Sequence, residues 1–131
     1  GGFMSSYTMV NHPEAFQVGL VGAPVTDWRL YDNIYTERYM GLLPQNSEKY
    51  TNQVVTKDAK NLKGKILLAH STMDDNVHII NTFQAVKAFT DAGKDIDLRI
   101  YPPGNHAVSY STESYILLYQ TYFNYLETHL K

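Results

Sequence analysis

The stretch "KILLAHSTMDDNVH", residues 65–78, decides the fold. Its short apolar run, residues 66–69, does not alternate with polar residues, which is typical of a strand buried on both faces of a parallel sheet. Two carboxylates, an Asn and two His residues crowd directly after that run. Ligands and catalytic groups gather at the carboxyl ends of the strands in such sheets. The stretch therefore predicts a strand that leads into a functional loop.

The residues before this strand alternate between helical and extended patterns. Residues 1–12 carry apolar residues at helical spacing and stop at Pro13, and "FQVGLVGAP", residues 16–24, suits a buried strand. An aromatic-rich excursion follows, with helical pieces over residues 28–40 and breaks at Gly41 and Pro44. A further helix is expected to begin at an N-cap, Asn46 or Ser47, and to end at Gly64.

The residues after the acidic loop continue the alternation. A helix is expected over residues 79–92, with its apolar stripe formed by Ile79, Phe83, Val86 and Phe89. Residues 96–101 alternate apolar and charged side chains, which favours a strand near the edge of the sheet. Residues 112–131 predict a closing helix with an acidic start and a basic end. Strands that alternate with helices indicate the α/β class, with parallel strands covered on both faces.

Composition limits the possible functions. The 131 residues, 44% of them hydrophobic, suffice for one modest core, so one domain or a piece of one is expected. The formal charge of -2 and the scattered Lys and Arg residues argue against nucleic acid as a partner. The lack of Cys excludes disulfides and thiolate metal sites, and no apolar run approaches the length of about 18 residues that spans a bilayer.

Asp74 and His106 each follow a predicted strand, and their order along the chain matters. Asp followed by His is the end of the order Ser, Asp, His that α/β-hydrolases use. The alternatives without a catalytic role are that Asp74 only forms a turn at the end of the strand and that His106 is an ordinary loop residue. The Ser of α/β-hydrolases lies in Gly-x-Ser-x-Gly before a helix, so Gly1 is expected to be the last Gly of that motif, with the Ser two residues upstream. Ser71 is the one candidate for a substitute nucleophile within the chain.

Three segments carry a more specific resemblance: "WRLYDNIYTERYMG" (residues 28–41), "HSTMDDNVH" (residues 70–78) and the late His106. Over essentially its whole length the chain resembles the C-terminal part of the catalytic domain in the dipeptidyl peptidase IV branch of the prolyl oligopeptidase family of serine peptidases. The resemblance implies that residues 1–131 are the C-terminal half of an α/β-hydrolase fold. It also implies that the nucleophile elbow and a propeller lie upstream, together with an oxyanion Tyr and the Glu pair that binds the substrate amine.

The resemblance also implies roles for individual residues. It places the triad acid at Asp74 and the triad base at His106, a substrate-carbonyl ligand at Asn76, and a proline pocket at Val25, Trp28, Tyr31, Tyr35 and Val77. No metal or other cofactor is implied. Because His70 ends a strand while His78 starts a helix, these two His residues are not expected to bind a metal together. The chain has "HST" and "NHAV" where the family usually has His-Gly, which predicts some difference in loop geometry.

The implied substrates are peptides with Pro or Ala at the second position, from which dipeptides are released. The resemblance suggests a periplasmic, extracellular or membrane-anchored parent. A homo-oligomer is also expected, because a fragment of such a sheet would leave one apolar strand edge unpaired. Two alternatives stay open: another α/β-hydrolase such as an acylaminoacyl peptidase or esterase, and a non-catalytic binding protein of the same family that lacks the Ser.

Overall fold

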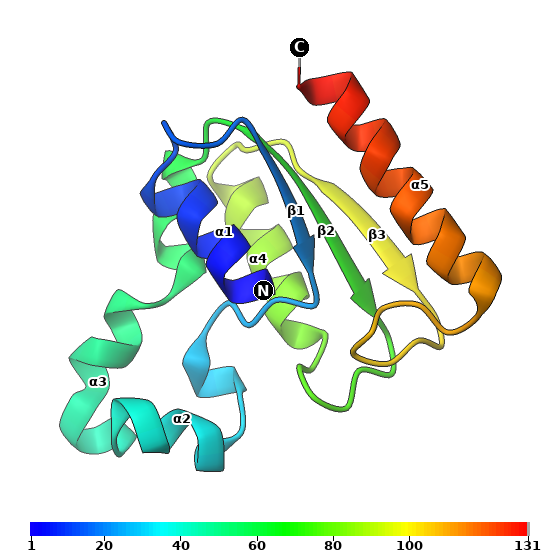
Figure 1. The fold of residues 1–131 in the computed structure, drawn as a ribbon. Helices are drawn as coiled ribbons and strands as arrows, with labels where there is room; N and C mark the ends of the chain where they lie inside the picture. The colour runs from blue at the N-terminus through cyan, green and yellow to red at the C-terminus, as the bar shows by residue number, and fades with distance from the viewer. Residues whose placement is uncertain (131) are drawn as a thin grey trace.

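A three-stranded parallel sheet forms the centre of the computed structural model, which describes residues 1–130 (Figure 1). The strands β1 (Val18–Gly22), β2 (Lys65–Ser71) and β3 (Asp97–Tyr101) lie in the order β1-β2-β3. Every residue of β2 after Lys65 is buried, as the apolar run predicted. The strands fall within or next to the predicted ranges, and the predicted α/β class with parallel strands is confirmed.

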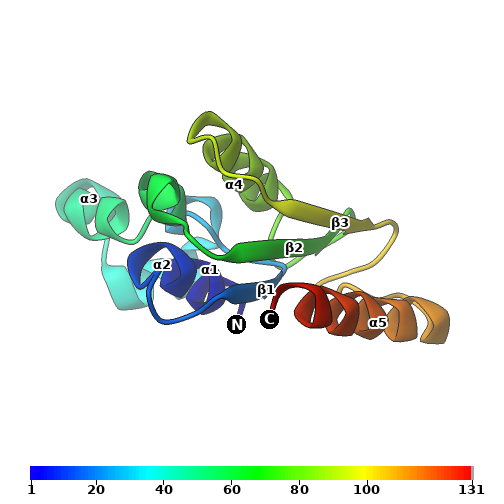
Figure 2. The same ribbon diagram turned by 90° about the horizontal axis from the view of Figure 1, so that it is seen from above.

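Helices cover both faces of the sheet (Figure 2). On one face α1 (Gly2–Asn11), α4 (Ile80–Asp91) and the 3₁₀ segment η2 (Val55–Asn61) pack around Ile66 and Leu68. On the other face α5 (Thr112–His129) packs against Ala69 and Tyr101. Successive strand residues point to opposite faces, so the apolar run of β2 supplies both layers of the core.

The excursion between β1 and β2 differs from the prediction in its second half. It contains a 3₁₀ turn, η1 (Trp28–Leu30), and two helices, α2 (Asn33–Met40) and α3 (Leu43–Asn52). The expected helix from Asn46 or Ser47 to Gly64 is wrong: α3 begins three residues earlier, and Asn46 lies inside it at a kink. Pro44 was expected to break the helical pattern. It lies instead in the first turn of α3, where the backbone N–H has no intrahelical partner, and so is compatible with the start of this helix. After Asn52 the chain continues in η2.

The buried face of α4 was also predicted wrongly in part. Phe89 is buried, but Phe83 is 48% exposed, and the inward positions hold Asn81, Thr82 and Ala85. The two polar side chains face inward because each has a hydrogen-bond partner in the core. Within residues 1–130 no helix is both long and apolar enough to cross a membrane.

Candidate functional site

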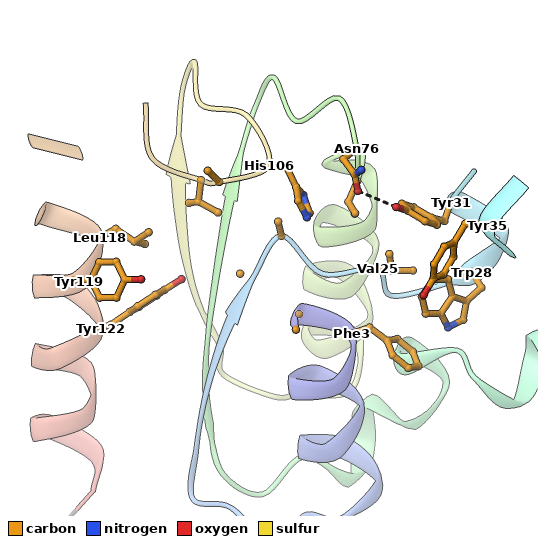
Figure 3. A pocket seen from close by; sticks show the side chains of 17 residues that line it. Phe3, Val25, Trp28, Tyr31, Tyr35, Asn76, His106, Leu118, Tyr119 and Tyr122 are labelled. Carbon is orange, nitrogen blue, oxygen red and sulfur yellow. Dashed lines mark hydrogen bonds between the residues drawn. The ribbon is translucent and has the colours of Figure 1, made fainter. Parts of the chain in front are cut away.

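The loops that follow the three strands meet at one edge of the sheet, around a cavity of about 460 Å³ (Figure 3). Parallel strands place their carboxyl ends together, so residues far apart in sequence converge there. The predicted substrate-binding residues and His106 all border this cavity, and Asp74 lies behind His106. The structure therefore brings the whole predicted set together: Asp74, His106, Val25, Trp28, Tyr31, Tyr35, Asn76 and Val77. Their chemical roles stay predictions.

The Asp74 carboxylate and the His106 ring are directly hydrogen-bonded. Nδ1 of His106 donates to Oδ2 of Asp74 over 2.9 Å. The Asp74 side chain is fully shielded from solvent, whereas 48% of the His106 side chain is exposed, and its ring reaches into the cavity (Figure 3). Because Asp74 occupies Nδ1, the far nitrogen, Nε2, is left to exchange a proton with another group.

The acid is held in its ionised form by its own loop. The other carboxylate oxygen, Oδ1, accepts hydrogen bonds from the backbone N–H groups of Asn76 (2.9 Å) and Val77 (2.8 Å). Burial alone would raise the pKa of Asp74, but the hydrogen bonds from His106, Val77 and Asn76 outweigh it and hold that pKa below its usual value. A negative charge therefore stands behind His106 at neutral pH.

A second histidine contacts the same carboxylate. His70, the sixth residue of β2, is completely buried, and its Nε2 lies 3.1 Å from Oδ2 of Asp74 and 2.9 Å from the Val77 carbonyl oxygen. Its Nδ1 lies 2.7 Å from Oγ1 of Thr82. Burial lowers the pKa of His70. Sequence reasoning missed this contact, since a polar residue that ends a strand gives no sign of which partner it meets.

The loop that carries His106 is anchored to β2 by Ser71. Oγ of Ser71 donates to the Val108 carbonyl over 2.7 Å, and Ser71 is buried away from the cavity lining. This placement argues against Ser71 as a substitute nucleophile. Val108 has a φ of 70°, which is rare for a β-branched residue, so the loop stores backbone strain two residues beyond His106.

An aromatic wall closes the side of the cavity opposite α5. The Trp28 and Tyr35 rings stack with centroids 5.9 Å apart, and the Tyr31 ring stands edge-on to both. Two Asp caps set these rings in place: Asp27 accepts from the backbone of Arg29 at the start of η1, and Asp32 accepts from that of Tyr35 at the start of α2. The short capped segments thus orient the aromatic residues toward one surface.

The aromatic wall is tied to the acidic loop, and the chain just before the wall is tied to α4. The Tyr31 hydroxyl donates to Oδ1 of Asn76 over 2.9 Å, which leaves the Asn76 amide N–H groups for another acceptor. Deeper in the protein, Oδ1 of Asn81 accepts from the backbone N–H of Thr26, whose hydroxyl donates to the Asn81 carbonyl. Thr26 and Asn81 are both fully buried, 55 residues apart in sequence, and were not predicted as part of the site.

The start of α1 forms the floor of the cavity. Gly1 and Gly2 border it together with His106. A Cβ atom at Gly2 would lie 2.3 Å from the Gly22 carbonyl oxygen, so only glycine permits this close approach between α1 and the end of β1. Residues at this helix start therefore lie on the same cavity as Nε2 of His106.

Residues of α5 border the remaining side of the cavity. Figure 3 shows Leu118, Tyr119 and Tyr122 across from the aromatic wall, with His106 between the two groups. Burial is the main cause that raises the pKa of Tyr122 to about 12, so its hydroxyl stays neutral at physiological pH.

The whole chain, residues 1–131, matches the sequence profile described as the prolyl oligopeptidase family. The chain belongs to the prolyl oligopeptidase family. Curated relatives of the chain include dipeptidyl peptidase 4 of Bos taurus, which is 41% identical over 86% of the chain and 15% of the relative's length. Dipeptidyl aminopeptidase A of Saccharomyces cerevisiae is 35% identical over 94% of the chain and 14% of its own length.

Two solved structures agree with the fold. The Porphyromonas gingivalis dipeptidyl peptidase 4 superimposes with a TM-score of 0.94 at 31% identity, over 98% of this chain and 18% of that one. A putative dipeptidyl aminopeptidase IV from Bacteroides ovatus gives 0.93 at 34% identity, with the same coverage. The chain thus spans less than a fifth of the relatives and structures that it matches, and the predicted α/β-hydrolase arrangement is confirmed.

Proposed function

We propose that this chain is the C-terminal half of the α/β-hydrolase catalytic domain of a dipeptidyl peptidase, which releases X-Pro or X-Ala dipeptides from peptide N-termini. The observation that carries the proposal is the 2.9 Å hydrogen bond between Asp74 and His106 beside an aromatic-walled cavity. The nucleophilic Ser and the groups that bind the substrate amine belong to other parts of the parent protein. The position of Gly1 and Gly2 on the cavity is consistent with a nucleophile just before α1.

The chemistry follows from the free nitrogen of His106. Nε2 takes the proton of the Ser hydroxyl as Ser Oγ attacks the scissile carbonyl, and then gives this proton to the leaving amine as the C–N bond breaks. Water then attacks the acyl-enzyme with the same base and releases the dipeptide. Asp74 keeps the ring in the Nδ1–H tautomer and stabilises the imidazolium that forms.

The cavity suits a substrate with a small apolar ring at the second position. Trp28, Tyr31 and Tyr35 present flat apolar faces, and burial of a ring of pyrrolidine size in such a site is worth about 1.5 to 3 kcal/mol. The free amide N–H groups of Asn76 are positioned to donate to a substrate carbonyl.

The test uses the full-length parent protein and dipeptidyl anilides. Gly-Pro-p-nitroanilide should release its dye, and His106→Ala should abolish the release, whereas His12→Ala, a change at an exposed histidine outside the cavity, should leave the rate unchanged. A parent that cleaves only N-acetylated substrates or simple esters would point to a different hydrolase. A parent that binds Gly-Pro peptides without cleaving them would be a binding protein.

A further inference from the structure

His70 stands behind the Asp74–His106 pair as a third member of a buried hydrogen-bonded chain. Four donors surround the carboxylate: the two backbone N–H groups on Oδ1, and the ring nitrogens of His70 and His106 on Oδ2. The side chains of His70 and Asp74 are both fully shielded from solvent. Both carboxylate oxygens are thus saturated, and Asp74 has no freedom to rotate.

The surroundings of His70 determine its tautomer. Nε2 faces two groups that carry no proton, the Asp74 carboxylate and the Val77 carbonyl, so it must hold the hydrogen and donate to both. On the opposite side Nδ1 accepts from the Thr82 hydroxyl. In this arrangement His70 is a neutral imidazole with every polar atom partnered.

We propose that His70 is a positioning residue that tunes the strength of the Asp74–His106 couple through its Nε2–H donor. This inference rests on the proposed peptidase function. A neutral donor stabilises the carboxylate and fixes Oδ2 in line with His106, yet adds no positive charge that would oppose the imidazolium formed on His106. Loss of the donor would leave a looser and more basic carboxylate.

The titratable groups near the couple come from several elements. His70 faces Asp74 from β2, and His106 faces it from the loop after β3. Tyr31 and Tyr35 border the cavity from the excursion, and Tyr119 and Tyr122 from α5. Of these groups, only His70 and His106 contact the Asp74 carboxylate. A substitution of His70 should therefore change the pH dependence of the reaction directly.

The experiment compares His70→Phe and His70→Gln in the full-length protein, with Gly-Pro-p-nitroanilide as substrate and titration of active Ser by an organophosphorus reagent. His70→Phe removes the donor, and kcat should fall about tenfold with little change in KM. The acid limb of the pH profile of kcat/KM should move up by about 0.5 to 1 unit, because a more basic carboxylate stabilises the imidazolium more strongly. His70→Gln retains an N–H donor at the Nε2 position and should recover most of both effects.

Two further variants separate positioning from folding. Phe89→Leu loosens the same face of the sheet away from the cavity and should lower stability without moving the acid limb. Thr82→Val removes the hydroxyl that supports Nδ1 and should shift the limb in the same direction by a smaller amount, so it serves as the test if His70→Phe does not fold.

The outcomes are distinct for the two proposals. An unshifted acid limb and an unchanged kcat in His70→Phe, or in Thr82→Val if the first variant does not fold, would overturn the role of His70. The role of His70 would also be overturned if Phe89→Leu moved the acid limb as far as His70→Phe does, or if His70→Gln failed to restore kcat and the position of that limb. A wild-type parent without peptidase activity would instead overturn the proposed function itself.

Discussion

Replacement of Asp74 by Asn in the full-length protein isolates the charge behind His106. In the proposed reaction an imidazolium forms on His106, and its charge centre lies about 4 Å from that of the carboxylate. At an effective dielectric constant near 20 their attraction is about 4 kcal/mol. Loss of this term slows turnover about 10³-fold. Asn also offers an N–H where His106 needs an acceptor, which favours the wrong tautomer and brings the expected loss of kcat close to 10⁴-fold.

The assay is steady-state release of p-nitroaniline from Gly-Pro-p-nitroanilide, normalised to the amount of folded protein measured by circular dichroism. Asp75→Asn is the matched control, because Asp75 is the neighbouring acid in the same loop and is exposed to solvent. It should retain activity within about twofold. A loss of less than tenfold in Asp74→Asn, or an equal loss in Asp75→Asn, would refute the assignment of Asp74.

Further predictions concern the pocket, the floor of the cavity, stability and association. Tyr31→Phe removes the hydrogen bond to Asn76 and should raise KM about three- to tenfold with kcat within about twofold. Gly2→Ala places a Cβ against the Gly22 carbonyl and should lower the free energy of unfolding in denaturant by about 1 to 3 kcal/mol. Gly1→Ala has open space around its Cβ and should change this free energy little. Equal losses in the two variants would contradict the close packing at Gly2. Burial lowers the pKa of His70 from 6.5 in the folded protein, so the unfolded state binds a proton at this residue first as the pH falls. The melting temperature should therefore decrease below about pH 6.5, and the His70→Gln variant should lack the part of this decrease that His70 causes. Within residues 1–130 β1 pairs on one side only, so the 131-residue chain expressed alone should self-associate and release no dye, and sedimentation of a stable monomer would count against this.

The sequence predicted the sheet well because its strands are short and bounded by turn residues, with apolar runs in β1 and β2 and an apolar-charged alternation in β3. β2 is the clearest example: an unbroken apolar run can be buried on both faces only in the middle of a covered sheet. The rule that functional groups gather at the carboxyl ends of such strands then located Asp74 and His106, and family resemblance supplied the pocket residues.

The parts that escaped prediction depend on contacts between distant residues. Asn46 has the side chain of an N-cap, but Pro44 two residues earlier already suits the first turn of α3. On α4 the inward positions include Asn81 and Thr82, whose partners Thr26 and His70 lie far away in sequence. A helical pattern read from apolar residues alone assigns such polar residues to the surface, which is how Phe83 was misplaced.

One carboxylate both orients His106 and shapes the cavity. Through Oδ2, Asp74 holds His106; through Oδ1 it folds the turn that presents Asn76 and Val77 to the cavity. Loss of both oxygens would therefore disturb turnover and recognition together, whereas Asp74→Asn keeps an acceptor at the Oδ1 position. A related protein that lost its nucleophile but still bound peptides would need Asp74 to keep this turn folded. The presence of this acid in a sequence therefore indicates an intact pocket, and it does not by itself indicate an active enzyme.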